Sequence, residues 1–160
     1  MALAPEDLMR ILGVPPENLD CGGLKLHLWK VFRLIGKGEL GKDRKRLPPV
    51  DEVEPRNGVF KLDPGCYRIR YAEVVRVPAN CVAIALPRSS LLRMGATIFS
   101  AVWDPGYEGR GEGMMIVANP FGVEIEVGAQ VAQLVFISMA RATARVYRGS
   151  YYRENMGEDI

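Results

Sequence analysis

The sequence has few of the residues that hold small proteins together covalently or through metal ions. Its 160 residues include three cysteines and one histidine. The cysteines, at Cys21, Cys66 and Cys81, are widely spaced and form no C-x-x-C pair, so we expect no structural zinc site. A chain of this length buries a sizeable core without such links. Reduced thiols then fit a cytoplasmic protein.

Long apolar runs and an excess of one charge are also missing. No apolar segment approaches the length of a membrane span, and the first residues lack the basic and apolar regions of a signal peptide. We therefore expect no contact with a membrane. The formal net charge of +2 is too small to indicate nucleic acid as a partner. Any anionic ligand must be attracted by a local cluster of charge.

Helical periodicity is scarce as well. In most of the chain, apolar and polar residues alternate with the period of two that is typical of strands. One short helix is predicted where Pro5 precedes two carboxylates, with Gly13 at its end. Short strands then recur about every ten residues, which favours an all-β sandwich or barrel. We expect one domain over 1–160, with 1–20 forming the N-terminal helix and turn. The polar tail, 145–160, is expected to be mobile until something binds.

The sequence also predicts the structure of several local segments. The stretch 36–57, rich in Gly, Pro and charge, is interpreted as a loop or insertion. Asp63–Pro64–Gly65 has the proline and glycine of a type II turn. His27 lies in a strand with no second histidine or cysteine nearby, so we interpret it as a surface residue.

The richest chemistry lies between two apolar strands. Arg88 is followed by Ser89 and Ser90, a combination that holds phosphate through a guanidinium and two hydroxyls, or simply forms a turn. Asp104 and Tyr107 belong to a turn-like Asp-Pro-Gly-Tyr segment. The alternative is a general base beside a ring that stacks on a sugar or base. Spacing alone does not separate these alternatives.

Four motifs in a fixed order resemble one protein superfamily. They are LDPGCYRI, LPRSSLLRMG, AVWDPGYEG and VEIEVGAQVAQLVF, between Leu62 and Phe136. Together they resemble the trimeric dUTPase and dCTP deaminase superfamily, and most of all its archaeal dUTPase branch.

The resemblance implies a distorted antiparallel β-barrel, related to a jelly roll, that forms homotrimers with active sites shared between subunits. It implies a deoxynucleoside triphosphate as substrate and hydrolysis of dUTP to dUMP and pyrophosphate. It also implies Mg²⁺ held mainly through substrate phosphates, with no set of protein ligands.

The same resemblance assigns roles to individual residues. Asp104 matches the aspartate that activates the attacking water, and Tyr107 the ring that packs against deoxyribose. Glu112 and Met114 lie in a segment expected to contact uracil through its backbone, together with 99–101. Residues matching the phosphate-binding groups are Arg88, Ser89, Ser90, Arg93 and Gln133, and Tyr147 matches a tail aromatic.

Two departures from the pattern keep alternatives open. Deaminases of the superfamily carry a proton-shuttling glutamate ten residues after the aspartate, where this chain has Met114. Glu112 is displaced from that position by about 7 Å along a strand. The aspartate of the first motif is replaced by Lys25. The alternatives to a dUTPase are therefore a dCTP deaminase, with or without triphosphate cleavage, and a nucleotide-binding trimer with impaired catalysis.

Overall fold

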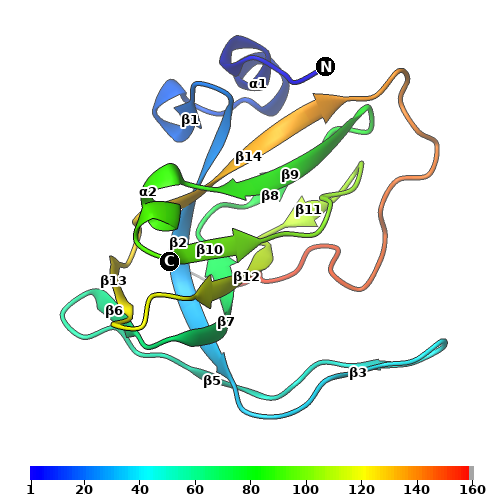
Figure 1. Cartoon of the computed structure of the whole chain (residues 1–160). Helices are drawn as coiled ribbons and strands as arrows, with labels where there is room; N and C mark the ends of the chain where they lie inside the picture. The colour runs from blue at the N-terminus through cyan, green and yellow to red at the C-terminus, as the bar shows by residue number, and fades with distance from the viewer. Residues whose placement is uncertain (159–160) are drawn as a thin grey trace.

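The computed structural model describes residues 1–158, and most of them belong to antiparallel sheets (Figure 1). The helical segments are α1 (Pro5–Leu12), the 3₁₀ turn η1 (Pro16–Asn18) and α2 (Ser89–Arg93). The strands up to the middle of the chain are β1 (Leu19–Asp20), β2 (Gly23–Leu34), β3 (Glu39–Leu40), β4 (Lys45–Arg46), β5 (Val50–Glu52), β6 (Val59–Leu62) and β7 (Gly65–Tyr71). The remaining strands are β8 (Val75–Arg76), β9 (Cys81–Pro87), β10 (Ala96–Phe99), β11 (Glu108–Gly109), β12 (Glu112–Val117), β13 (Val123–Glu126) and β14 (Gln130–Ser138).

The main sheet has the order β10-β12-β7-β2-β14-β9, with β1 and β5 added beside β2. All its neighbouring strands are antiparallel, and the sheet curls until its end strands β10 and β9 lie close together. The result is the nearly closed antiparallel barrel that the sequence predicts. Shorter pairs, β8 with β11 and β6 with β13, extend it.

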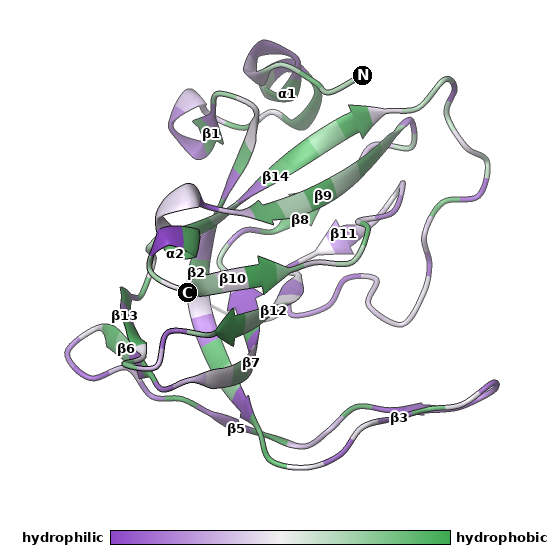
Figure 2. Ribbon diagram, in the orientation of Figure 1, coloured by the Kyte–Doolittle hydropathy of each residue, from purple (hydrophilic) through white to green (hydrophobic). Residues whose placement is uncertain are grey.

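Strand β2 organises the barrel because it pairs with different partners along its length. Its first half pairs with β14 and its second half with β7, with an irregularity in register between Leu28 and Lys30. The alternation predicted from sequence is present: Leu24, Leu26 and Leu28 are all buried. β9 and β14 are mostly hydrophobic (Figure 2). Their inward side chains, such as Leu134 and Phe136, complete the core.

The N-terminal helix forms where the sequence predicts it. Gly13 follows α1 with a φ of 66°, and its amide donates to the Met9 carbonyl oxygen. That left-handed conformation carries no Cβ penalty in glycine, which explains why the helix ends there. Leu8 points from α1 into the core and is fully buried. Within residues 1–158, no helix has the length and hydrophobicity needed to cross a membrane.

Four local expectations need correction. Gly65 has an extended φ of 158° and begins β7, so the type II turn is wrong. His27 is only partly exposed, and its Nδ1 contacts a carboxylate oxygen of Glu73, so it is not a plain surface residue. The segment 36–57 includes a β3–β4 hairpin that projects from the barrel (Figure 1), besides β5. A second helix, α2, follows β9, where only a short turn was considered.

Candidate functional site

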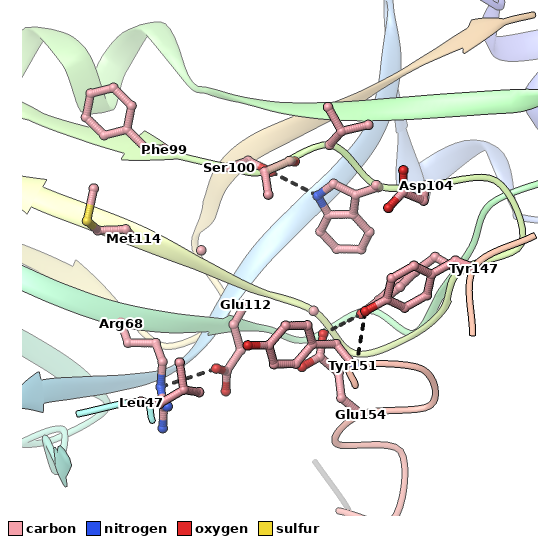
Figure 3. A pocket seen from close by; sticks show the side chains of 16 residues that line it. Leu47, Arg68, Phe99, Ser100, Asp104, Glu112, Met114, Tyr147, Tyr151 and Glu154 are labelled. Carbon is pink, nitrogen blue, oxygen red and sulfur yellow. Dashed lines mark hydrogen bonds and ion pairs between the residues drawn. The ribbon is translucent and has the colours of Figure 1, made fainter. Parts of the chain in front are cut away.

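A cavity of about 490 Å³ opens on the outer face of the barrel (Figure 3). Five parts of the chain form its walls: the end of β10 with the loop after it, the start of β12, one residue of β7, Leu47 after β4, and the tail. Its lining includes Asp104, Tyr107, Glu112, Met114 and Tyr147, five of the residues singled out in the sequence, and also Arg68, Trp103, Tyr151 and Glu154.

Strand register places one row of side chains across the cavity. Phe99 of β10 lies opposite Met114 of β12, which lies opposite Arg68 of β7. Directly opposed residues of antiparallel strands point to the same face. Phe99 and Met114 are 55% and 41% exposed, so this face is the outer one. Met114, at the position of the deaminase glutamate, thus lies beside Arg68.

Two glycines allow aromatic side chains to pack closely against the backbone at the floor of the cavity. A Cβ at Gly111 would lie 2.4 Å from Cη2 of Trp103, and one at Gly113 would lie 2.6 Å from the Tyr71 hydroxyl oxygen. Glu112 stands between them. The sequence Gly-Glu-Gly therefore allows two aromatic side chains to pack directly on the backbone of β12 while one carboxylate faces the cavity.

Asp104 sits at the rim on a firmly held loop. The preceding Trp103 pairs with Ala83 of β9 through two backbone hydrogen bonds of 2.8 and 2.9 Å. The Tyr107 amide donates to the Asp104 carbonyl oxygen at 3.0 Å, and Gly106 takes the positive φ of 78° that the turn needs. The Asp104 side chain is exposed, and no hydrogen bond or ion pair within residues 1–158 engages its carboxylate. It is free to accept a hydrogen bond from water.

Tyr107 is buried beside the cavity and holds a residue of the tail. Its ring packs edge-on against Trp103, with centroids 5.1 Å apart, and its hydroxyl donates to Glu154 at 2.8 Å. Burial, and then the nearby Glu154 carboxylate, raise the pKa of the Tyr107 phenol, which stays protonated and serves as a donor. Burial also raises the pKa of Glu154.

Glu112 is fixed by two arginines of β7. Arg70 donates to it from Nε and Nη2 at 3.0 and 2.8 Å, and Nε of Arg68 lies 3.2 Å away. Arg70 is itself buried and also reaches Glu158 at 2.5 Å. Glu112 is therefore held in place as the carboxylate between two arginines.

The tail forms the last wall. Arg110, which is buried, donates to the carbonyl oxygens of Asn155 and Glu158 at 3.1 and 2.6 Å. The Tyr147 amide donates to Pro105 at 2.7 Å, which places Tyr147 over Tyr107. The mobility expected for 145–160 stays a prediction, and residues 159–160 lie outside the described part of the chain.

The residues expected to bind phosphate form a second cluster. Arg88 forms an ion pair with Asp20, which also accepts from Gln130 at 3.3 Å. The Cys21 amide, then Gln130 and Arg88, lower the pKa of Asp20. The Gln133 amide oxygen, turned toward the β1–β2 turn, accepts from the amides of Gly22 and Gly23 at 3.1 and 3.0 Å. Ser89, Ser90 and Arg93 are exposed on α2.

One chain does not bring the two clusters together. Trp103, next to Asp104, is bridged to Ala83 near the start of β9, whereas Arg88 follows its far end. Five residues of strand span roughly 16 Å. Asp104 with Tyr107 and Arg88 with its serines thus form two separate clusters in this chain. Lys25 belongs to the second, with its ammonium donating to the Glu17 carbonyl oxygen at 2.8 Å.

Sequence reasoning missed Arg68, Trp103, Arg110 and Glu154. Arg68 carries a signal, since it alternates with buried Tyr67 and Ile69 and so faces outward from β7. Glu154 carries none, because its partner Tyr107 lies 47 positions away.

Comparisons with known proteins agree on one family. The model of the family described as dCTP deaminase-like matches residues 2–139. A protein of Aeropyrum pernix, named a probable deoxyuridine 5′-triphosphate nucleotidohydrolase, is 40% identical over 98% of this chain and 100% of its own length. A deoxyuridine 5′-triphosphate nucleotidohydrolase of Methanocaldococcus jannaschii is 41% identical over 84% of this chain and 87% of its own.

Among solved structures, the 2′-deoxycytidine 5′-triphosphate deaminase of Agrobacterium tumefaciens has the same fold. It superposes with a TM-score of 0.64 at 19% identity, over 84% of this chain and 47% of that one.

Proposed function

This chain belongs to the dCTP deaminase-like family, and we propose that it hydrolyses dUTP to dUMP and pyrophosphate. The observation that carries the proposal is the cavity lined by Asp104, Tyr107 and Met114. Met114 is the residue that the resemblance matches to the deaminase glutamate. The relatives named deoxyuridine triphosphate nucleotidohydrolases support the same substrate.

Asp104 acts as the general base. A water molecule hydrogen-bonded to its carboxylate attacks the α-phosphorus and gives its proton to Asp104. The bond from the α-phosphorus to the oxygen shared with the β-phosphorus breaks, and pyrophosphate leaves with that oxygen. Tyr107 supports the deoxyribose with its ring, and Tyr147 covers Tyr107 from the tail.

The phosphate-binding half of the site comes from a second copy within a homotrimer. Arg88, Ser89, Ser90, Arg93 and Gln133 are the groups that would hold the triphosphate, and they are remote from Asp104 in their own chain. Exposed apolar side chains support such an assembly. Leu86, Leu92, Phe99 and Val102 are all more than half exposed on β9, α2, β10 and the following loop.

We propose that a Mg²⁺ ion arrives with the substrate. Within residues 1–158, no three His, Cys, Asp or Glu side chains are grouped so that they could hold a metal ion. The ion would be held by phosphate oxygens and water, and it would neutralise charge on the phosphates. We also propose a cytoplasmic location, which suits the three free thiols.

Deamination is disfavoured by the side chains around the base. The Met114 thioether neither accepts nor donates a proton, and the Glu112 carboxylate is held by Arg68 and Arg70. Glu112 and Met114 then contact the base without chemistry. A binding protein without turnover is the remaining alternative, and Lys25 in place of an aspartate is its basis.

Product analysis tests the proposal. The protein, incubated with Mg²⁺ and either dUTP or dCTP, is expected to form dUMP and pyrophosphate from dUTP and to release no ammonia from dCTP. Steady ammonia release from dCTP would instead make the protein a deaminase. Tight binding of dUTP without any product would make it a binding protein.

A further inference from the structure

Arg68 lines the cavity but has no part in the hydrolysis described above. Its Nε is buried and, among residues 1–158, finds no partner with hydrogen-bond alignment. Glu112 lies close enough for an ion pair, at 3.2 Å, but poorly aligned. The Arg68 side chain as a whole is 27% exposed and lines the cavity, so a ligand there can reach its guanidinium even though Nε itself is covered.

The guanidinium is held in place although no hydrogen bond from it is found within residues 1–158. Its central carbon lies 4.9 Å from the centroid of the Phe32 ring, on the neighbouring strand β2. Glu112 is held independently by Arg70. The cavity therefore presents a fixed donor, Arg68, next to a fixed acceptor, Glu112.

Strand register gives the order of this pair along the cavity. Glu112 lies opposite Arg70, whereas Arg68 lies opposite Met114, two residues further along β12 and away from Tyr107. A ligand whose sugar rests on Tyr107 meets Glu112 first and Arg68 beyond it. This placement of the sugar rests on the proposed function.

We propose that Arg68 selects uracil over cytosine by donating to the oxygen on ring atom 4. In a pyrimidine nucleotide, atom 4 lies opposite the sugar-bearing N1, and N3 lies beside it. Uracil presents an N–H at N3, which suits Glu112, and a carbonyl oxygen at atom 4, which suits Arg68. Cytosine presents a lone pair to the carboxylate and an amino group to the guanidinium, so both contacts are mismatched.

The test measures binding of dUTP and dCTP by calorimetry in EDTA, so that no turnover is needed. Wild-type protein is expected to bind dUTP at least ~100-fold more tightly than dCTP. Arg68→Met keeps the length of the side chain but removes its donors. It is expected to weaken dUTP binding by about 10- to 100-fold and leave dCTP binding almost unchanged.

Two further variants separate a specific effect of Arg68 from a general effect of the substitution or of poor folding. Arg33→Met makes the same chemical change at an exposed position of β2 outside the cavity, and it should keep the wild-type preference. Arg68→Lys keeps one charged donor and should retain part of the preference, even if Arg68→Met folds poorly. A dUTP-to-dCTP affinity ratio that is the same in wild type and both Arg68 variants would overturn the inference. A wild type that binds dUTP selectively without hydrolysing it would overturn the proposed function and leave the role of Arg68 standing.

Discussion

At the scale of single residues, the site depends on absent side chains as much as on present ones. Gly111 has no Cβ, and the edge of the Trp103 ring takes the space where one would be. Trp103 in turn holds Tyr107 and, through its backbone pairing with Ala83, fixes the loop that carries Asp104. A close contact at Gly111, just before β12, therefore helps to position the proposed base.

Gly111→Ala is expected to destabilise the protein. The new Cβ would overlap the Trp103 ring, so the ring or the strand must shift, at a cost of about 1–3 kcal/mol. Thermal unfolding should show a lowered Tm, and dUTP turnover should fall because Asp104 moves with the loop. Gly157→Ala is the matched control, since a Cβ there would meet nothing within 4 Å. Equal Tm values for the two variants would contradict this account of the cavity floor.

Only some of the residues in the site could be predicted from the sequence. The assignments of Asp104, Tyr107 and Met114 rest on the superfamily resemblance, since the spacing of these residues alone leaves a plain turn as an alternative. Arg68 contacts Glu112, and Glu154 contacts Tyr107. In each pair the two residues are 44 or more positions apart in the sequence. No local pattern encodes such contacts, since they exist only once the barrel and the tail are folded.

At the scale of elements, period-two alternation predicts the long strands well. β2, β7, β9 and β14 each bury one face, and that face is apolar in the sequence. The short elements could not be predicted from periodicity, for a physical reason. α2 has five residues and β11 has two, too few to show a period, and their conformation is set by packing against neighbours.

The tail is the element whose stability should respond to pH. Glu154 is partly buried against Tyr107, and burial raises its pKa, so docking of the tail favours its protonated form. That contribution is complete at acid pH and is lost as the pH rises through the raised pKa. Glu108 and Glu158, whose pKa values are lowered, act in the opposite direction.

Glu154→Gln isolates the contribution of this one carboxyl. Glutamine keeps an acceptor for the Tyr107 hydroxyl and carries no charge, so the variant should be more stable than wild type at pH 8. The gain should be about 1 kcal/mol or less, or a few degrees in Tm. The gap should close as the pH falls below the ordinary glutamate pKa of about 4.3. Tm differences that stay constant between pH 4 and pH 8 would contradict a buried, titrating Glu154.

At the scale of the whole molecule, the fold separates the groups that the proposed mechanism needs together. Asp104 and Arg88 lie toward opposite ends of β9, each in a well-formed local environment. The proposed trimer with shared sites would resolve this separation, because the pocket of one copy would then receive the arginine turn of another. The superfamily resemblance implies this arrangement, which stays a prediction, whereas the strand pattern alone does not imply it.

Two variants and their mixture test this account most directly. Asp104→Asn removes the proposed base but keeps the side-chain size, and Arg88→Gln removes a proposed phosphate ligand. Each alone should form trimers, checked by light scattering, and Asp104→Asn should hydrolyse dUTP at least ~10²-fold more slowly than wild type. Co-expressed chains should regain about one quarter of wild-type turnover, because that share of sites receives a native Asp104 and a native Arg88 from different copies. Near-normal turnover by Asp104→Asn alone, or mixed trimers no more active than either parent, would contradict the account.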